Sequence, residues 1–324
     1  MFQKKLIILF RWGGNRVTKK TIHIASVADN NYVQHLGVMY QSLLMNIPHD
    51  KCVRFHLLHK DINKENIVKL SELVTSKNGE IQFYKIDTQI YENVFTSNHI
   101  TEAAYYRISI PDILEESIEK VIYLDCDLVI KNDISLLWDV ELTDYSIGAV
   151  GNLGGYKRFN DLDIPSQYKY FNSGVLILNL KKWRKNKTAQ LVLSYMERKK
   201  GQLVYHDQDA LNGVLYNDWL ELHPKWNMQY NMYFKSQDNH TFVADQLSSA
   251  VKTPYIIHYT GSCKPWDYHD THPLGKEYYK YIYETDWKDF RPQFTMKRGF
   301  KKVMKIMLPI KTRYYLMSKF KNKN

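Results

Sequence analysis

Two carboxylates directly follow a short apolar run in the stretch Lys120–Asp133, which reads KVIYLDCDLVIKND. The run Val121–Leu124 is β-branched and aromatic and stops at a charge, which is typical of a buried parallel strand. Asp125 and Asp127 are therefore expected just beyond the carboxyl end of a strand, where ligands collect in an open α/β sheet. On a turn, they could converge on Mn²⁺ or Mg²⁺, whose shell a phosphate can complete. Solvated turns also favour Asp, so the motif alone leaves both interpretations open.

A similar group of residues follows the first expected strand. Val27 and Ala28 leave room for a nucleoside base, on which Tyr32 could stack. The side chains of Asp29 and Asn31 offer hydrogen bonds to uracil or ribose. The alternative is an ordinary strand-to-helix turn, because Asp and Asn are favoured as helix caps.

A late strand, Pro254–His258, ends in a histidine. Its neutral imidazole could be a third ligand beside two carboxylates, a mixture that Mn²⁺ accepts, or it could simply be packed and hydrogen-bonded. After it, Gly261 allows a close backbone approach, and Lys264 offers a positive charge to a diphosphate. The segment 258–266 is compact enough to wrap a phosphate.

Further polar candidates lie on two predicted helices. Asp207 is suitably placed to cap the helix Gln208–Tyr216. The acid–amide–acid set Asp207–Asp209 would also suit the hydroxyl groups of a sugar. Arg107, on the helix Ala103–Ile110, is either a surface charge or an anchor for a phosphate or a sugar.

The elements that must position these residues alternate between strand and helix. Strands are expected at Thr21–Val27, Val53–Leu58, Ile81–Ile86 and Val121–Leu124, and helices at Gln34–Asn46, Asn63–Ser76 and Ala103–Ile110, the last ended by Pro111. Because connections between parallel strands cross over with one hand, this order predicts a parallel, doubly wound sheet. Later elements are expected at Ser146–Val150, Gly174–Leu178, Lys181–Lys199, Gln208–Tyr216 and Pro254–His258.

The positive charge of the chain, +11 in total, is concentrated at its two ends. Residues 291–324 hold 11 basic and no acidic residues, and residues 1–20 hold six basic and no acidic residues. Residues 21–290 hold 28 basic and 34 acidic residues, which argues against nucleic acid as a partner, since a nucleic-acid-binding domain carries its positive charge on the folded body. The charge pattern predicts a basic extension (1–20), one globular domain (21–290) and a basic tail (291–324).

The basic tail has an amphipathic pattern. Apolar residues recur at helical spacing beside lysines, at Phe300, Val303, Met304, Met307 and Leu308. The pattern predicts an interfacial helix on an anionic membrane surface, with a disordered basic tail as the alternative. Three distant cysteines give no disulfide framework, and no apolar run approaches the ~20 residues that span a bilayer. We therefore expect a cytoplasmic protein without a signal peptide, peripheral at the inner face of the cell membrane.

Eight short stretches occur in the order and spacing of one enzyme family: Asp29–Tyr32, Tyr106–Arg107, Tyr123–Asp127, Leu137–Asp139, Phe171–Val175, Leu180–Trp183, Asp207–Asn212 and His258–Gly261. Together they resemble glycosyltransferase family 8, close to the bacterial lipopolysaccharide galactosyl- and glucosyltransferases, over roughly residues 21–285. The resemblance implies an α/β GT-A fold, a doubly wound, mostly parallel sheet with a Rossmann-like nucleotide-sugar-binding half and a mixed acceptor-side half. It also implies retaining transfer of galactose or glucose from a UDP-hexose, with Mn²⁺ or alternatively Mg²⁺, to a glycan or glycolipid acceptor at the cell surface.

The resemblance also assigns roles residue by residue. It implies metal ligands at Asp125, Asp127 and His258. The nucleotide-sugar would be held by Val27, Ala28, Asp29, Asn31, Tyr32, Asn172, Ser173, Gly261 and Lys264. The catalytic set would be Gln208, Asp207 and Arg107, with Gln208 on the face of the sugar opposite the leaving group. One departure is Asn152, where relatives often carry Asp, so the choice between galactose and glucose stays open.

The chemistry expected of this set is front-face attack, because the amide of Gln208 is a poor nucleophile. A double displacement would require Asp207 to move in. Two other classes stay open: a catalytically silent nucleotide- or sugar-binding module, and a metal phosphoesterase, for which the chain offers few ligands. The acceptor groove is expected in the variable loops around 152–170 and 225–250.

Overall fold

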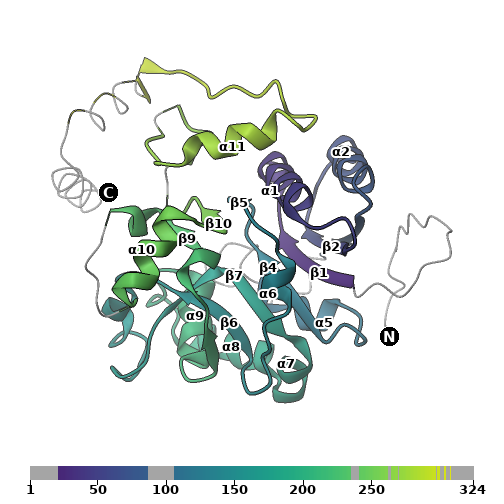
Figure 1. The fold of residues 1–324 in the computed structure, drawn as a ribbon. Helices are drawn as coiled ribbons and strands as arrows, with labels where there is room; N and C mark the ends of the chain where they lie inside the picture. The colour runs from purple at the N-terminus through teal and green to yellow at the C-terminus, as the bar shows by residue number, and fades with distance from the viewer. Residues whose placement is uncertain are drawn as a thin grey trace.

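The computed structural model of the protein describes residues 21–86, 106–234, 241–261, 264–268, 270–296, 298, 299, 303 and 307. The described chain forms a seven-stranded sheet of order β3-β2-β1-β4-β7-β6-β8 and a three-stranded sheet of order β5-β10-β9, with helices on both faces of the larger one (Figure 1). The N-terminal extension 1–20, most of the basic tail and part of the helix expected at Ala103–Ile110 lie outside the described residues.

The strands of the larger sheet are β1 (Thr21–Val27), β2 (Cys52–His59), β3 (Glu80–Lys85), β4 (Lys120–Leu124), β6 (Ile147–Gly151), β7 (Phe171–Asn179) and β8 (Trp219–Glu221). The smaller sheet holds β5 (Leu128–Ile130), β9 (Met228–Gln229) and β10 (Ile256–His258). The α-helices are α1 (Val33–Asn46), α2 (Lys64–Thr75), α5 (Ile110–Ile113), α6 (Ser135–Trp138), α7 (Leu180–Asn186), α8 (Thr188–Arg198), α9 (His206–Leu215), α10 (Ala244–Lys252) and α11 (Gly275–Ile282).

The N-terminal half of the larger sheet is the doubly wound unit that the sequence predicts. Strand β1 is parallel to both β2 and β4, and β2 is parallel to β3. The second half is mixed, because β7 runs antiparallel to β4 and to β6, while β6 and β8 are parallel. The predicted combination of a Rossmann-like half and a mixed half is thus confirmed.

Alternate residues of the central strands enter two separate hydrophobic cores, as the period of a strand requires. Ile122 and Leu124 of β4 pack in the core under α1 and α2, whereas Val121 and Tyr123 pack in the core that contains residues of α7, α8 and α9. Because both faces of the strand are covered, its sequence is continuously apolar. The sheet therefore ends abruptly at the charge of Asp125.

The smaller sheet brings a late part of the chain to the end of β4. The link Asp125–Asp127 joins β4 of the larger sheet to β5 of the smaller one. Strand β10 runs antiparallel to β5, with His258 opposite Leu128, and the backbone N–H of Tyr259 donates to the carbonyl of Asp127 at 3.0 Å. The histidine is therefore held beside the two carboxylates by strand pairing.

Two helix boundaries differ from the sequence-based expectation. Pro111 does not end a helix; it lies in the first turn of α5, where a proline is tolerated because its missing N–H has no helical partner. The helix expected at Lys181–Lys199 is two helices, because Lys187 adopts a left-handed conformation (φ 53°, ψ 39°) between α7 and α8. Neither change moves a residue of the expected site.

Candidate active site

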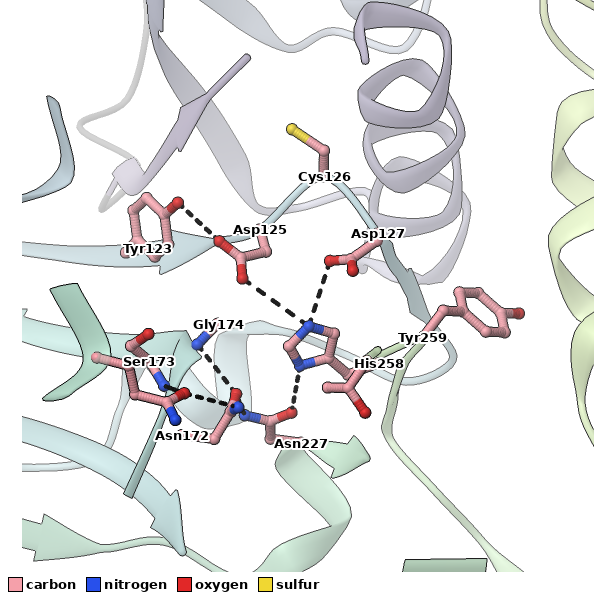
Figure 2. Close-up of polar contacts among 12 residues, drawn as sticks. Tyr123, Asp125, Cys126, Asp127, Asn172, Ser173, Gly174, Asn227, His258 and Tyr259 are labelled. Carbon is pink, nitrogen blue, oxygen red and sulfur yellow. Dashed lines mark hydrogen bonds and ion pairs between the residues drawn. The ribbon is translucent and has the colours of Figure 1, made fainter. Parts of the chain in front are cut away.

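Three of the predicted site residues meet where the two sheets join (Figure 2). The Nε2 atom of His258 lies 3.2 Å from Oδ1 of Asp127 and 3.8 Å from Oδ2 of Asp125. One ligand atom from each residue lies within 4.8 Å of the other two. Between Asp125 and Asp127, the side chain of Cys126 points the other way and donates from Sγ to the carbonyl of Val27 at 3.0 Å. Alternation along the chain thus puts both carboxylates on one side.

Lys264 lies beside Asp125, Asp127 and His258, and these four residues form the candidate metal corner of the site. Its ammonium lies 2.6 Å from Oδ2 of Asp127 and donates to the carbonyl of Tyr259 at 2.7 Å. Burial disfavours both charges, but Lys264 and His258 hold the pKa of Asp127 well below its usual range. Burial likewise opposes the charge of Lys264, whose pKa is nevertheless raised by Asp127. The corner therefore keeps an ionised carboxylate and a fixed ammonium, a pairing that suits a bound diphosphate and a cation together.

Arg107 links the metal corner to the start of helix α9. Its Nη2 atom donates to Oδ1 of Asp125 at 2.5 Å, and its Nη1 atom donates to Oδ2 of Asp207 at 2.6 Å. Further donations reach Ser173 Oγ at 2.7 Å and Tyr123 OH at 2.8 Å. Burial opposes its charge, yet the two carboxylates raise the pKa of Arg107 above its ordinary value. The guanidinium group of Arg107 is therefore held inside the site by four hydrogen bonds and is not a surface charge.

The predicted catalytic residues Asp207 and Gln208 lie in the first turn of α9, but Asp207 does not cap that helix. The helix begins at His206, and the carboxylate that accepts from the preceding backbone N–H groups, those of Val204 and Tyr205, belongs to Asp209. Burial and the charge of Asp125 raise the pKa of Asp207, against the opposing effect of Arg107.

Asp209, the third member of the acid–amide–acid set, is fully buried and is not available to a sugar. Its Oδ1 accepts from the hydroxyl of Tyr170 at 2.6 Å, and its Oδ2 pairs with Arg158 at 3.2 Å. The set therefore divides into two residues at the site and one that holds the helix start.

A chain of buried amides joins His258 to Gln208. The Nδ1 atom of His258 lies 2.9 Å from Oδ1 of Asn227, whose Nδ2 donates to Oδ1 of Asn172 at 2.9 Å. The Nδ2 atom of Asn172 donates in turn to Oε1 of Gln208 at 3.0 Å. Asn172 therefore reaches the site as predicted, yet its side chain is occupied by protein groups.

The closeness of β7 to the metal corner depends on a glycine. A Cβ atom on Gly174 would lie 2.2 Å from Cε1 of His258 and 2.7 Å from Oδ2 of Asp125, distances that non-bonded atoms do not adopt. The backbone N–H of Asp125 also donates to the carbonyl of Gly174 at 2.9 Å. Gly174 thus allows the two ligands to approach the strand.

The predicted uridine-binding residues surround the end of β1. Tyr32 is 42% exposed, and its ring lies edge-on to Trp266, with 6.2 Å between the ring centroids. Oδ1 of Asp29 accepts from the backbone N–H groups of Asn31 and Tyr32, so this oxygen supports the turn. Val27 and Ala28 are buried, and Asn31 is exposed. Of these residues, the exposed ring of Tyr32 is best placed to stack on a base.

On the other side of the site, Asn152 opens onto a cavity of about 100 Å³. The cavity wall includes Tyr156, Tyr168 and Tyr170 from the loop 152–170, together with Thr241. Both loops expected to form an acceptor groove therefore contribute to it. The hydroxyl of Tyr170 accepts from Nε2 of Gln208 at 3.2 Å, so the cavity adjoins the catalytic helix.

Sequence reasoning missed Asn227 and Tyr123 as members of the site. Asn227 follows the short helical turn Pro224–Trp226 and precedes a two-residue strand, so no periodic pattern marked it. Tyr123 is expected from the sequence as a strand residue and as part of the family stretch Tyr123–Asp127, with no role in the site, although its hydroxyl donates to Oδ1 of Asp125 at 2.8 Å. A tyrosine two residues before a carboxylate lies on the same side of a strand, and that spacing was the available signal.

Solved structures with a similar fold include glycosyltransferases. The galactosyltransferase LgtC, in complex with donor and acceptor sugar analogues, matches with a TM-score of 0.73 and 25% identity over 86% of this chain and 100% of that chain. The bifunctional glycosyltransferase WbbM matches with a TM-score of 0.73 and 23% identity over 89% of this chain and 53% of that chain. The fold is therefore the GT-A fold of a glycosyltransferase.

Sequence comparison is more specific. The sequence model of the family "Glycosyl transferase family 8" matches residues 23–270. General stress protein A of Bacillus subtilis (strain 168) is 39% identical over 270 residues, which are 82% of this chain and 94% of that protein. Lipopolysaccharide 1,2-glucosyltransferase of Escherichia coli (strain K12) is 28% identical over 281 residues, 85% of this chain and 82% of that protein. The chain belongs to glycosyltransferase family 8, as its motifs predict.

Proposed function

We propose that this glycosyltransferase is a retaining enzyme that moves galactose or glucose from a UDP-hexose to a cell-surface glycan or glycolipid acceptor in the presence of Mn²⁺, with Mg²⁺ as the alternative. The observation that carries the proposal is the convergence of Asp125, Asp127 and His258 beside Lys264. Two carboxylates and an imidazole are a donor set that Mn²⁺ accepts. Two names support the substrate class: that of the relative lipopolysaccharide 1,2-glucosyltransferase, and that of the galactosyltransferase LgtC in complex with donor and acceptor sugar analogues.

The residues around the metal corner would hold the departing nucleotide. When bound, the divalent cation would supply Lewis-acid stabilisation of the UDP leaving group. Lys264 would place its ammonium against the diphosphate. Gly261 has φ of 91°, and a Cβ added there would meet no atom within 4 Å, so the backbone leaves space for a close approach. Tyr32 and Asp29 would hold the uridine at the end of β1.

The sugar would lie beside the ion pair of Arg107 with Asp207 at the start of α9, with front-face attack by the acceptor. The carbonyl of Gln208 already accepts from Asn172 Nδ2 and from the backbone N–H of Ser173, each at 3.0 Å, which lowers its nucleophilicity. The carboxylate of Asp207 is held by Arg107 at 2.6 Å. Neither group is free to attack the anomeric carbon without breaking these bonds. A sugar found covalently attached to Asp207 or Gln208 by mass spectrometry would contradict this mechanism.

The acceptor is proposed to enter over the cavity beside Asn152, whose tyrosine-rich wall suits stacking against sugar rings.

The basic tail would place this cavity near a membrane. Of its described residues, Met296, Val303 and Met307 are helical and are 85%, 51% and 75% exposed. Their spacing of seven and four residues puts them on one side of a helix, which suits an interfacial segment. No helix in the described part of the chain is long and apolar enough to cross a membrane.

The first test is calorimetric titration of UDP with and without Mn²⁺, on the wild-type protein and on Asp127→Asn. We expect binding that requires Mn²⁺ and fails in the variant, because the substitution removes one ligand charge and the partner of Lys264. A panel of UDP-sugars would then identify the hexose. Binding that ignores both the metal and the substitution would instead favour a nucleotide-binding module without catalytic activity.

A further inference from the structure

We propose that Asn227 is a positioning residue that acts in two directions: it fixes the imidazole of His258 for the metal, and through Asn172 it fixes the amide of Gln208 on the sugar side. This inference rests on the proposed metal and sugar sites. It makes the two ends of the site a single hydrogen-bonded unit, although His258 lies on β10 of the smaller sheet and Gln208 lies on helix α9. Figure 2 shows the contacts that run from His258 to Asn227, from Asn227 to Asn172 and from the backbone of Gly174 to Asn172.

Two backbone N–H groups determine the direction of every bond in this chain of amides. The N–H of Gly174 donates to Oδ1 of Asn172 at 3.0 Å, and the N–H of Ser173 donates to Oε1 of Gln208 at 3.0 Å. A backbone N–H can only donate, so both side-chain atoms must be oxygens. Asn172 therefore presents its oxygen to Asn227 and its nitrogen to Gln208.

The orientation of Asn227 follows from that of Asn172. The atom of Asn227 that faces Oδ1 of Asn172 must be its nitrogen, since two oxygens would repel each other at 2.9 Å. Its oxygen then faces Nδ1 of His258, also at 2.9 Å. This oxygen accepts only if Nδ1 carries the proton. In the neutral imidazole, Nε2 is therefore left as a lone-pair donor directed at the two carboxylates, which is the form that binds a metal.

Burial makes this orientation costly to change. Asn227 is 0% exposed, His258 is 3% exposed and Asn172 is 7% exposed, so water cannot readily replace a lost partner. If the amide of Asn227 were flipped, its oxygen would face Oδ1 of Asn172, and its NH₂ group would face the N–H at Nδ1 of His258. The same holds for Gln208, whose carbonyl has both lone pairs engaged and whose Nε2 donates to Tyr170.

Two substitutions at Asn227 separate its two directions. Asn227→Ala removes both contacts and frees the imidazole. Asn227→Asp keeps an oxygen that can accept from Nδ1 of His258 but removes the donor to Asn172. Gln229→Leu is the matched control, because Gln229 is another buried amide of the same segment, and its Nε2 donates to the carbonyl of Gly151 outside the chain of amides.

The experiment measures Mn²⁺ affinity from the free-ion signal in electron paramagnetic resonance, together with hydrolysis of UDP-glucose and UDP-galactose. We expect Asn227→Ala to weaken Mn²⁺ binding about 10- to 100-fold, as loss of a partner behind a ligand histidine does. We expect Asn227→Asp to bind Mn²⁺ at least as tightly as the wild type but to hydrolyse the donor at least about tenfold more slowly, because the Gln208 amide has lost its support. Gln229→Leu should change neither quantity more than about threefold.

The outcomes distinguish this inference from the proposed function. A wild-type protein that fails to bind Mn²⁺ would overturn the metal site itself and the inference with it. Wild-type binding combined with unchanged Mn²⁺ affinity in Asn227→Ala would overturn the inference alone. So would a loss of Mn²⁺ binding in Asn227→Asp, which is isosteric and decides the question even if the alanine variant does not fold. Unchanged donor hydrolysis in Asn227→Asp would contradict the link to Gln208.

Discussion

Gly174 has no side chain, and this absence lets His258 and Asp125 lie close to β7. We predict that Gly174→Ala weakens Mn²⁺ binding by at least about tenfold, or about 1.4 kcal/mol, because the added methyl group would overlap His258 and Asp125. Mn²⁺ titration followed by electron paramagnetic resonance measures the change.

Gly148→Ala is the control for a methyl group added to the same sheet. Its Cβ would meet Leu142 at 3.2 Å and Ile177 at 3.4 Å, away from the ligands. Equal Mn²⁺ affinities for Gly174→Ala and the wild type would show that His258 is not held where the strand places it.

The expected metal ligands could be predicted from the sequence, whereas the residues that orient them could not. Asp125, Asp127 and His258 follow apolar strands, so their position at a sheet edge could be inferred. Asn227 could not, because its role depends on a contact with His258 that only the smaller sheet creates. The role of Asn172 was foreseen as a sugar contact, whereas its side chain is occupied by Asn227 and Gln208.

The start of α9, which carries the proposed catalytic residues, is held by a buried carboxylate, Asp209, that pairs with Arg158. We predict that Asp209→Asn lowers the free energy of unfolding by about 1.5–3 kcal/mol, because it removes the charge that accepts from Arg158 and from two backbone N–H groups, while Arg158 keeps its ion pair with Asp161. Chemical denaturation measures this value.

Glu221→Gln provides the comparison. The pair between Glu221 and Lys169 is exposed on both sides, so we expect a change below about 1 kcal/mol. Similar losses in the two variants would show that the buried pair does not organise the helix start.

The first two strands carry an acid-sensitive histidine pair. Nδ1 of His23 lies 2.9 Å from Nε2 of His56, whose Nδ1 lies 3.0 Å from the hydroxyl of Tyr84. Burial, with a contribution from Arg54, lowers the pKa of His23 from 6.5 to about 4. Burial, with contributions from His23 and Arg54, lowers the pKa of His56 to about 3. Both rings are therefore neutral in the folded protein at pH 7.

Because these pKa values are lower in the folded state, the unfolded chain takes up protons first. The stability that the pair contributes is complete above pH 6.5 and is lost as the pH falls towards about 4 and then about 3. We predict that the melting temperature of the wild type falls more steeply over this range than that of His23→Gln, which keeps an acceptor for His56 and removes one titrating group. Parallel melting profiles would contradict the prediction.

Element boundaries were predictable where packing and local signals agree. The alternation of strands and helices in the first half predicted the parallel sheet, because the strands β1, β2 and β4 are mainly buried and carry a clear apolar pattern. The direction of β7 was not predictable in the same way. The smaller sheet was not predictable either, because its strands have only two or three residues and carry too little pattern. The break at Lys187 also has no local signal, since lysine ordinarily favours a continuous helix.

For the whole molecule, we predict that deletion of residues 291–324 abolishes sedimentation with anionic vesicles and leaves Mn²⁺-dependent UDP binding intact. The tail holds 11 basic and no acidic residues, whereas the body carries a net negative charge. The measurement compares vesicles of phosphatidylglycerol and phosphatidylcholine with vesicles of phosphatidylcholine alone. A deletion variant that still sediments with anionic vesicles would assign membrane binding to the body.

The junction of the two sheets has a consequence for the protein during its synthesis. Asp125 and Asp127 leave the ribosome long before His258 and Lys264, and strand β5 has no partner in its sheet until β9 and β10 follow. A nascent chain that has reached β8 can complete the larger sheet and the start of α9, but it has only two of the three ligands. Premature release at that stage would give a product that lacks the metal corner and late members of the core such as Met228 and Ile256. The candidate active site is therefore completed last, after most of the larger sheet that supports it.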